Sequence, residues 1–154
     1  MDTDRFLRQA IELAHANVEH GGRPFGAVVV KDGAVVATGV NEMHVASDPT
    51  AHAELTALRA AGQKLASIRL DDCSVFASGH PCPMCMAAMR LAGIRHVAYA
   101  YSNDDGAPFG LSTAAIADDL AKPAAEQSMK IAYAPVRLDG RGDLYADWKQ
   151  KQGQ

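Results

Sequence analysis

The sequence lacks the features that mark several classes of protein. It has three cysteines in 154 residues, an odd number that argues against a framework of disulfides. It does not open with a basic region and an apolar run, and no stretch approaches the roughly 20 apolar residues of a membrane helix. The formal net charge of −3 does not favour a nucleic-acid surface, which needs clustered cations. We therefore expect a cytoplasmic protein with reduced thiols, no membrane contact and no nucleic-acid partner.

We expect one domain spanning residues 1–154, because the chain shows no repeats, low-complexity tracts or linkers. Hydrophobic periodicity and turn residues predict alternating helices and strands. In chain order these are a helix over Asp2–His20, strands over Ala27–Lys31 and Ala34–Val40, a helix over Ala51–Ala61, a strand over Cys73–Ser78, a helix over Met84–Ala92, a strand over Arg95–Ala100, a loop over Ser102–Gly110, a helix over Thr113–Leu120, a strand over Ile131–Leu138 and a helix over Leu144–Gln150. This order favours an α/β fold, a three-layer α/β/α domain around a five-stranded sheet.

Turn and cap residues refine this prediction. Asp32-Gly33 separates the first two strands and is typical of a tight hairpin, so the sheet should be mixed rather than purely parallel. Asp48 or Thr50 is expected to cap the helix that follows, and Gly62 is expected to end it. Pro135 favours an edge position or a bulge for the last strand.

Four residues at the starts of two predicted helices carry the chemistry. His52, Cys82 and Cys85 offer one imidazole and two thiols, a ligand set that suits Zn²⁺. Three protein ligands leave the fourth tetrahedral position open, which is typical of a catalytic site. A helix start favours the thiolate form of a cysteine. Glu54 follows His52 by two residues, so it can lean over the same cavity as an acid/base without binding the metal.

Other interpretations of these residues stay open. A Cys-x-x-Cys pair can be a redox couple, or half of a structural zinc site whose fourth ligand would be Cys73 or His80. Cys73 is expected to be a buried strand residue. His80 adjoins the Pro81-Cys82 pair, so it has either a surface position or a role in supporting the metal or the substrate. A zinc-stabilised binding module without turnover would need no acid/base at Glu54.

The chain resembles the cytidine deaminase-like superfamily, and more narrowly the guanine deaminase branch of bacterial nucleobase deaminases. The pattern His-x-Glu followed by Pro-Cys-x-x-Cys is the zinc deaminase signature, in which the glutamate is the proton carrier. The segments that carry the resemblance are Pro24–Val28, Lys31–Gly33, Asn41, Asp48–Glu54, Leu70–Cys73, Pro81–Cys85, Lys122–Ala124 and Trp148.

The resemblance implies a zinc-dependent hydrolytic deaminase with one Zn²⁺ per chain, acting on an aminated heterocycle, with guanine to xanthine favoured. It implies that Asn41 hydrogen-bonds the heterocycle and that Phe25 lines the pocket. Ala53 and the loop residues Ser112 and Thr113 are the remaining predicted substrate contacts. The resemblance also implies a homodimer, and the small apolar residues of Met84–Met89 are the predicted interface.

The chain departs from the guanine branch at three places. That branch usually has acidic residues in the loop that matches Ser112 and Thr113, a glutamate where His80 stands, and an aromatic residue near its C-terminus, whereas this chain ends Lys149–Gln154. Ammeline, cytosine, isocytosine and guanosine are therefore alternative substrates. A wobble-adenosine deaminase of tRNA shares the zinc motifs, but the acidic residues scattered after Ala100 disfavour it.

Overall fold

The computed structural model describes residues 2–153, which divide into two compact units between Lys122 and Pro123. The helices and strands of the first unit are α1 (Thr3–Glu19), β1 (Gly26–Lys31), β2 (Ala34–Val40), α2 (Met43–Ala46), α3 (Ala53–Leu65), β3 (Cys73–Gly79), α4 (Pro83–Leu91), β4 (His96–Tyr101), α5 (Asn103–Gly106), the 3₁₀ helix η1 (Ala107–Phe109) and α6 (Ala114–Leu120). The second unit holds η2 (Ala124–Glu126) and α7 (Leu144–Gln152). No helix within residues 2–153 is long and apolar enough to cross a bilayer.

The sheet is mixed, as the sequence predicted, and its strands lie in the order β2-β1-β3-β4. β1 pairs antiparallel with β2 and β3, whereas β3 and β4 run parallel. The hairpin between β1 and β2 turns at Asp32 and Gly33, whose φ angles of 52° and 75° are both left-handed. Two successive left-handed residues match the right-handed twist of paired strands.

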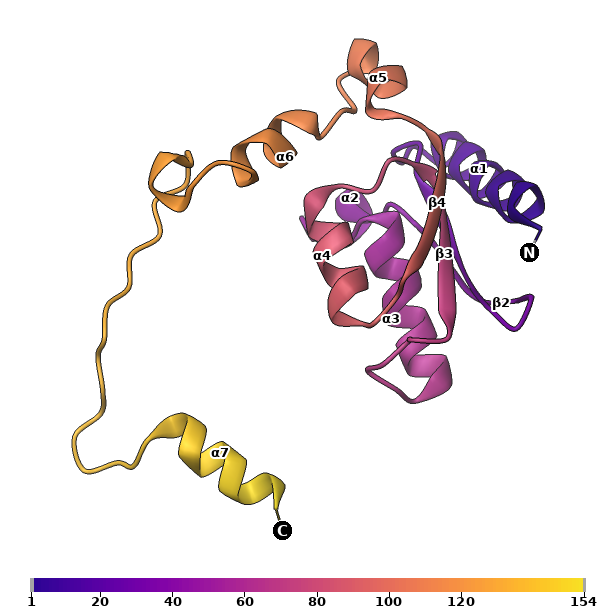
Figure 1. The fold of residues 1–154 in the computed structure, drawn as a ribbon. Coiled ribbons are helices and arrows are strands. Elements are labelled where there is room, and N and C mark those ends of the chain that lie inside the picture. Colours follow the sequence, from indigo (N-terminus) through magenta and orange to yellow (C-terminus); the bar gives the residue numbers. More distant parts are fainter. Residues whose placement is uncertain (1, 154) are drawn as a thin grey trace. The chain divides into compact units, whose positions relative to one another are not determined.

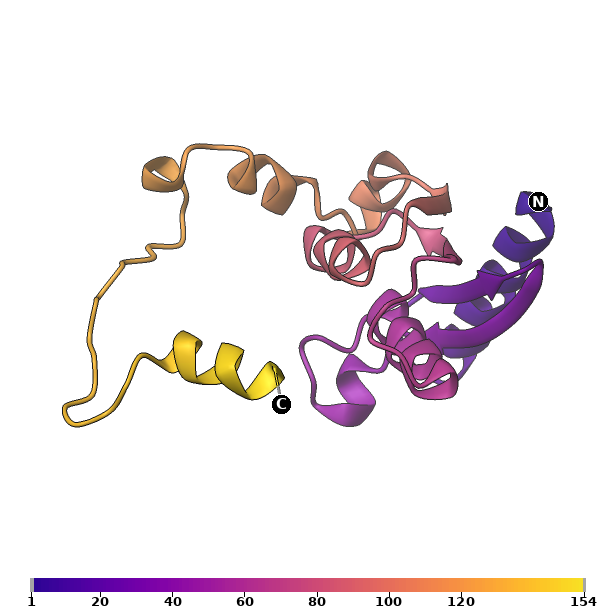
Figure 2. The same cartoon turned by 60° about the horizontal axis from the view of Figure 1, so that its bottom comes forward.

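Helices cover both faces of this sheet (Figures 1 and 2), as a three-layer α/β/α arrangement requires. α1 packs on one face through Phe6, which meets Val28, Val30 and Phe76 in a small apolar cluster. α3 and α4 lie on the other face, over the larger apolar cluster that contains Val29. Successive strand residues point to opposite faces, so the run Val28–Val30 serves both clusters.

The start of α3 lies close to β2, and a glycine makes that approach possible. A Cβ atom at Gly39 would collide with the carbonyl oxygen of Ala53 and the amide nitrogen of Ala57. Gly39 therefore fixes the distance between β2 and the first turn of α3, the turn that carries two of the predicted site residues.

The prediction of a fifth strand over Ile131–Leu138 is wrong, because the described residues form four strands and this segment has none. Its alternating apolar residues suit a strand, but its side chains are exposed. A strand exists only through hydrogen bonds to a neighbour, which an alternating pattern cannot supply.

Three further predictions of local structure are wrong. Neither Asp48 nor Thr50 caps α3; Asp48 instead accepts hydrogen bonds from the backbone N–H and hydroxyl of Thr50, and His52 is the N-cap. Gly62 lies inside α3, which continues to Leu65 and ends at a left-handed Ala66. The predicted loop over Ser102–Gly110 contains α5 and η1. α5 begins with a capping box in which Ser102 and Asp105 bond each other's backbone N–H groups.

Candidate metal centre and substrate cavity

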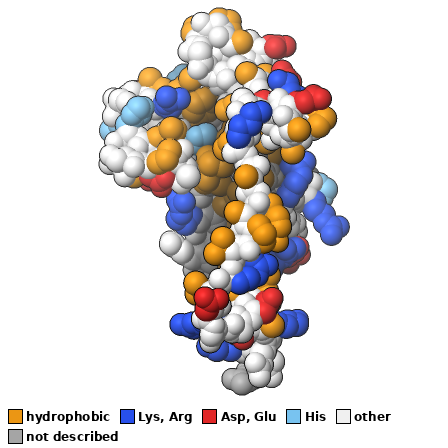
Figure 3. All heavy atoms as spheres, turned by 90° about the vertical axis from the view of Figure 1, so that its left-hand side faces the viewer, with side chains coloured by type: hydrophobic (Ala, Val, Ile, Leu, Met, Phe, Trp, Pro, Cys, Tyr) orange, Lys and Arg blue, Asp and Glu red, His pale blue; other side chains and the backbone are white. Residues whose placement is uncertain are grey.

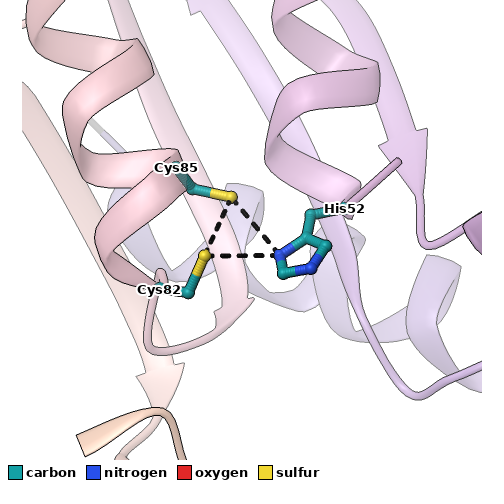
Figure 4. Close-up of side chains that lie close together, drawn as sticks. All are labelled: His52, Cys82 and Cys85. Carbon is teal, nitrogen blue, oxygen red and sulfur yellow. Dashed lines mark hydrogen bonds between the residues drawn. The ribbon is translucent and has the colours of Figure 1, made fainter. Parts of the chain in front are cut away.

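The first turns of α3 and α4 bring the predicted metal ligands together. His52 and Cys82 are the N-cap residues of the two helices, both in an extended conformation, and neither side chain caps its own helix. Figure 4 shows both side chains pointing into the space between the helices, where Cys85 joins them from the first turn of α4. Pro83 at the start of α4 has no N–H to leave unpaired, so the turn forms at low cost.

The distances between these side chains fit a tetrahedral zinc site. His52 Nδ1 lies 3.4 Å from Cys82 Sγ and 3.6 Å from Cys85 Sγ, and the two sulfurs lie 3.6 Å apart. Zinc–sulfur bonds of about 2.3 Å and zinc–nitrogen bonds of about 2.0–2.1 Å at tetrahedral angles give S···N distances of about 3.6 Å and S···S distances of about 3.8 Å. Within residues 2–153 these three side chains form the group able to hold a metal ion.

The electrostatics of the thiols also suit a cation. The hydrogen-bonding contact with Cys85 and, to a smaller extent, the one with His52 lower the pKa of the Cys82 thiol to about 4, against the opposing effect of burial. The same Cys82–Cys85 contact, together with burial, raises the pKa of Cys85. The hydrogen bond with Cys82 raises the pKa of His52. The cluster thus shares protons around a thiolate, and a divalent cation would displace them.

Glu54 lies beside this cluster and is the second residue of α3, directly after Ala53. Its side chain is buried, with 5% of the residue exposed, and its Oε2 accepts a hydrogen bond of 3.2 Å from the Cys85 thiol. Burial raises the pKa of the Glu54 carboxyl, and the hydrogen bond from Cys85 offsets part of that increase. A carboxyl with a raised pKa holds a proton closer to neutral pH, which suits a group that must both take and give one.

A cavity of about 170 Å³ opens beside the cluster. It is lined by most of the residues that the sequence singled out, namely Phe25, Asn41, His52, Ala53, Glu54, Cys82, Ser112 and Thr113. Cys85 is fully buried and does not line the cavity. Asn41 is buried, and its side-chain oxygen accepts a hydrogen bond from the backbone N–H of Met43. The cavity places the predicted substrate contacts around the predicted metal ligands, while their individual roles stay predictions.

Sequence reasoning missed part of the cavity wall. Arg23, Gly110 and Leu111 line it without any signal in the sequence motifs, and His80, for which the sequence left a surface position or a supporting role open, lines it as well. Arg23 follows α1 and directly precedes the motif Pro24–Val28, outside every motif that the sequence offers. Gly110 and Leu111 directly precede Ser112, so their place beside a predicted contact was the one available signal.

The chain is similar to known proteins at the metal centre and over most of the rest of its length. The family model described as "cytidine and deoxycytidylate deaminase zinc-binding region" matches residues 1–101. Guanine deaminase from Bacillus subtilis is 44% identical over 97% of this chain and 95% of its own. The X-ray structure of that enzyme superposes with a TM-score of 0.82 at 39% identity, covering 100% of this chain and 96% of its own.

Two more distant relatives match a smaller part of the chain. The tRNA-specific adenosine deaminase of Aquifex aeolicus is 34% identical over 64% of this chain and 66% of its own. The structure of guanine deaminase from Nitrosomonas europaea is 30% identical, with a TM-score of 0.67 over 70% of this chain and 63% of its own. The chain therefore belongs to the cytidine and deoxycytidylate deaminase family and is a zinc-binding deaminase.

Proposed function

We propose that this deaminase acts on a free aminated nucleobase and converts guanine to xanthine and ammonia. The observation that carries the proposal is the near full-length similarity to a guanine deaminase, which continues past the zinc motifs to 97% of the chain. The metal region alone identifies the reaction, because different deaminases share it. Similarity through the rest of the chain supports the substrate.

The size of the cavity favours a bare heterocycle over a larger substrate. Pockets for drug-sized ligands enclose about 300–1,000 Å³, whereas this cavity measures about 170 Å³. A nucleoside adds a ribose, and a tRNA adds phosphates that need clustered cations. The formal net charge of −3 offers no such excess.

We propose that His52, Cys82 and Cys85 hold one Zn²⁺, which when bound supplies a nucleophilic hydroxide at neutral pH by lowering the pKa of water. Glu54 accepts the proton of the attacking water and passes it to the ring nitrogen beside the amino-bearing carbon. Attack gives a tetrahedral carbon that carries both oxygen and nitrogen. Glu54 then takes the hydroxyl proton of this tetrahedral carbon and gives it to the amino group, which leaves as ammonia while the carbonyl forms.

The remaining lining residues would bind and orient the base. Phe25 offers an aromatic wall, and Asn41 offers an amide whose donor and acceptor can pair with a ring edge. Ala53 has no side chain beyond Cβ and leaves room beside Glu54. Ser112 and Thr113 offer hydroxyls, each able to donate or accept one hydrogen bond.

The test is the conversion of guanine by the purified, zinc-loaded protein. We expect xanthine and ammonia in equal amounts. Absence of xanthine from a protein that carries a full equivalent of zinc would contradict the proposed substrate and leave the zinc assignment intact.

We also propose that the protein is a homodimer. Exposed apolar side chains support an assembly, and Figure 3 shows orange hydrophobic side chains open on one face. Val97, Tyr99 and Tyr101 are exposed along β4, and Tyr133, Leu138, Leu144 and Trp148 are exposed in the C-terminal unit. Large exposed apolar surfaces and sheet edges are commonly covered by a partner.

The predicted interface at Met84–Met89 is less open, because Cys85 and Met89 are buried in the chain's own core. Light scattering at micromolar concentration should give twice the chain mass.

A further inference from the structure

His80 stands where the guanine branch usually carries glutamate, and it lies between two cavities. Its side chain lines the small cavity at the metal cluster and also an apolar cavity of about 520 Å³. Phe25 and Leu111 line both cavities as well, so these three side chains form the wall between them. His80 is therefore at the substrate cavity without belonging to the metal cluster.

The backbone and ring of His80 are held by β4. Its backbone N–H donates to the carbonyl oxygen of Tyr101 at 2.8 Å. Its ring stacks on Tyr99, with the ring centroids 4.5 Å apart and the planes inclined by 28°. This stacking holds the imidazole ring in place, so its Nδ1 atom has a fixed position.

Asn103 connects His80 to the substrate loop. Asn103 Nδ2 lies 2.6 Å from His80 Nδ1. The Oδ1 atom of the same amide accepts a hydrogen bond of 3.2 Å from the backbone N–H of Thr113. An NH₂ group can only donate, so Nδ1 of His80 is the acceptor. The Thr113 N–H can only donate, which fixes the amide in the same orientation. Each bond therefore supports the other.

This connection reaches the part of the cavity where a base must be recognised. Thr113 is the N-cap of α6, and Leu111, Ser112 and Thr113 line the same cavity as Glu54. Thr113 makes no side-chain cap hydrogen bond, so the Asn103 carbonyl is the contact that holds its backbone N–H. A freed backbone N–H at a loop would let the loop move.

We propose that His80 is a positioning residue that holds the Leu111–Thr113 loop against the substrate through Asn103 and so sets the affinity for the heterocycle. The inference rests on the proposed deaminase activity for its kinetic readout. The His80 side chain acts as a hydrogen-bond acceptor and takes no part in proton transfer.

The test compares three variants of the zinc-loaded, full-length protein. His80→Leu keeps an apolar bulk in the wall but removes the acceptor. Asn103→Ala removes the bridge. His80→Asn keeps an acceptor, because the Asn Oδ1 can take the place of the imidazole Nδ1. His15→Leu is the matched control, since His15 lines only the apolar cavity on the α1 side.

We expect His80→Leu and Asn103→Ala to raise KM for the base about tenfold, the usual value of one hydrogen bond, with kcat within about twofold. Their zinc content should equal that of the wild type. His80→Asn should restore most of the affinity, and His15→Leu should change neither constant. A double variant that combines His80→Leu with Asn103→Ala should have a KM no higher than that of either single variant, because both substitutions remove the same connection.

Hydrogen exchange at the Thr113 amide provides a readout that needs no substrate. We expect faster exchange in His80→Leu and Asn103→Ala, and wild-type exchange in His80→Asn and His15→Leu. Unchanged exchange in His80→Leu, or loss of its zinc, would overturn the inference. Inactivity of the wild type toward every base tested would instead refute the proposed function, and the exchange result would still decide the role of His80.

Discussion

The two sides of the substrate cavity are built in different ways. The metal side comes from the first turns of α3 and α4, where Cys85 is fully buried and Glu54 is 5% exposed. The loop side is the half-buried segment Leu111–Thr113, in which the backbone N–H groups of Leu111 and Thr113 donate to the Gly106 carbonyl and the Asn103 side chain. The metal side is thus part of the core, and the loop side can vary without disturbing it.

The comparisons follow the same division. The family model covers residues 1–101, which include every metal-side residue and end before the loop. The tRNA-specific adenosine deaminase of Aquifex aeolicus covers 64% of the chain, whereas the guanine deaminase of Bacillus subtilis covers 97%. Reaction chemistry is carried by the shared metal side, and we infer that substrate choice depends on the loop side.

The largest expected effect is at the metal. Cys82→Ala removes one of the three ligands, so bound zinc should fall by at least about tenfold and turnover with it. Metal analysis of the purified variant measures this. Cys73→Ala is the matched control, because Cys73 is also buried but stands at the start of β3, outside the cluster, and should keep a full equivalent of zinc.

The next effect separates the proton carrier from the ligands. Glu54→Gln should keep zinc and lose about 10²–10⁴-fold in kcat, because an amide cannot shuttle the proton. Paired zinc analysis and steady-state kinetics measure it. Glu42→Gln, on an exposed residue nearby, should behave as the wild type. A Glu54→Gln enzyme within tenfold of wild-type kcat would show that another group moves the protons.

A smaller effect is expected on the loop side. Thr113→Asp should raise kcat/KM for guanine by about tenfold or more, because a carboxylate gives donor groups on the base a charge-assisted hydrogen bond that a hydroxyl cannot. Ala115→Asp adds the same charge at an exposed position on α6 and should change little. A fall in kcat/KM for guanine in Thr113→Asp would show that this side chain does not meet the base as proposed.

The smallest effect concerns stability alone. The hydroxyl of Thr56 on α3 is buried without a hydrogen-bond partner among the described residues. Thr56→Val replaces it with a methyl group and should raise the free energy of unfolding by about 1 kcal/mol, with kcat unchanged. Chemical denaturation measures the change, and a loss of stability would mean that the hydroxyl has a partner in solution.

The sequence predicts which residues gather at the metal side because these residues lie in two short motifs, each at the start of a helix. His52 and Glu54 are two residues apart, and Cys82 and Cys85 are three apart. The connection from His80 through Asn103 to Thr113 joins positions 23 and 10 residues apart. Such contacts depend on how β3, β4 and the loop pack, which no local pattern encodes.

The errors in the predicted fold have the same origin. Alternation over Ile131–Leu138 describes a segment able to form a strand, but pairing depends on a neighbour. The loop predicted over Ser102–Gly110 follows from its aspartates and glycines, which favour turns, yet Ser102 and Asp105 form a capping box that begins α5. Gly62 does not end α3, because one glycine costs a helix only about 1 kcal/mol and the buried Leu58 and Ala61 pack the same helix into the core.

The most direct test is ammonia release by the zinc-loaded protein from guanine, cytosine, isocytosine and ammeline, in parallel with an anticodon stem-loop that carries a wobble adenosine. We predict turnover of a free base, with guanine the best of the four, and no deamination of the RNA. A protein inert toward all four bases but active on the stem-loop would contradict the account of the cavity as a site for a small heterocycle.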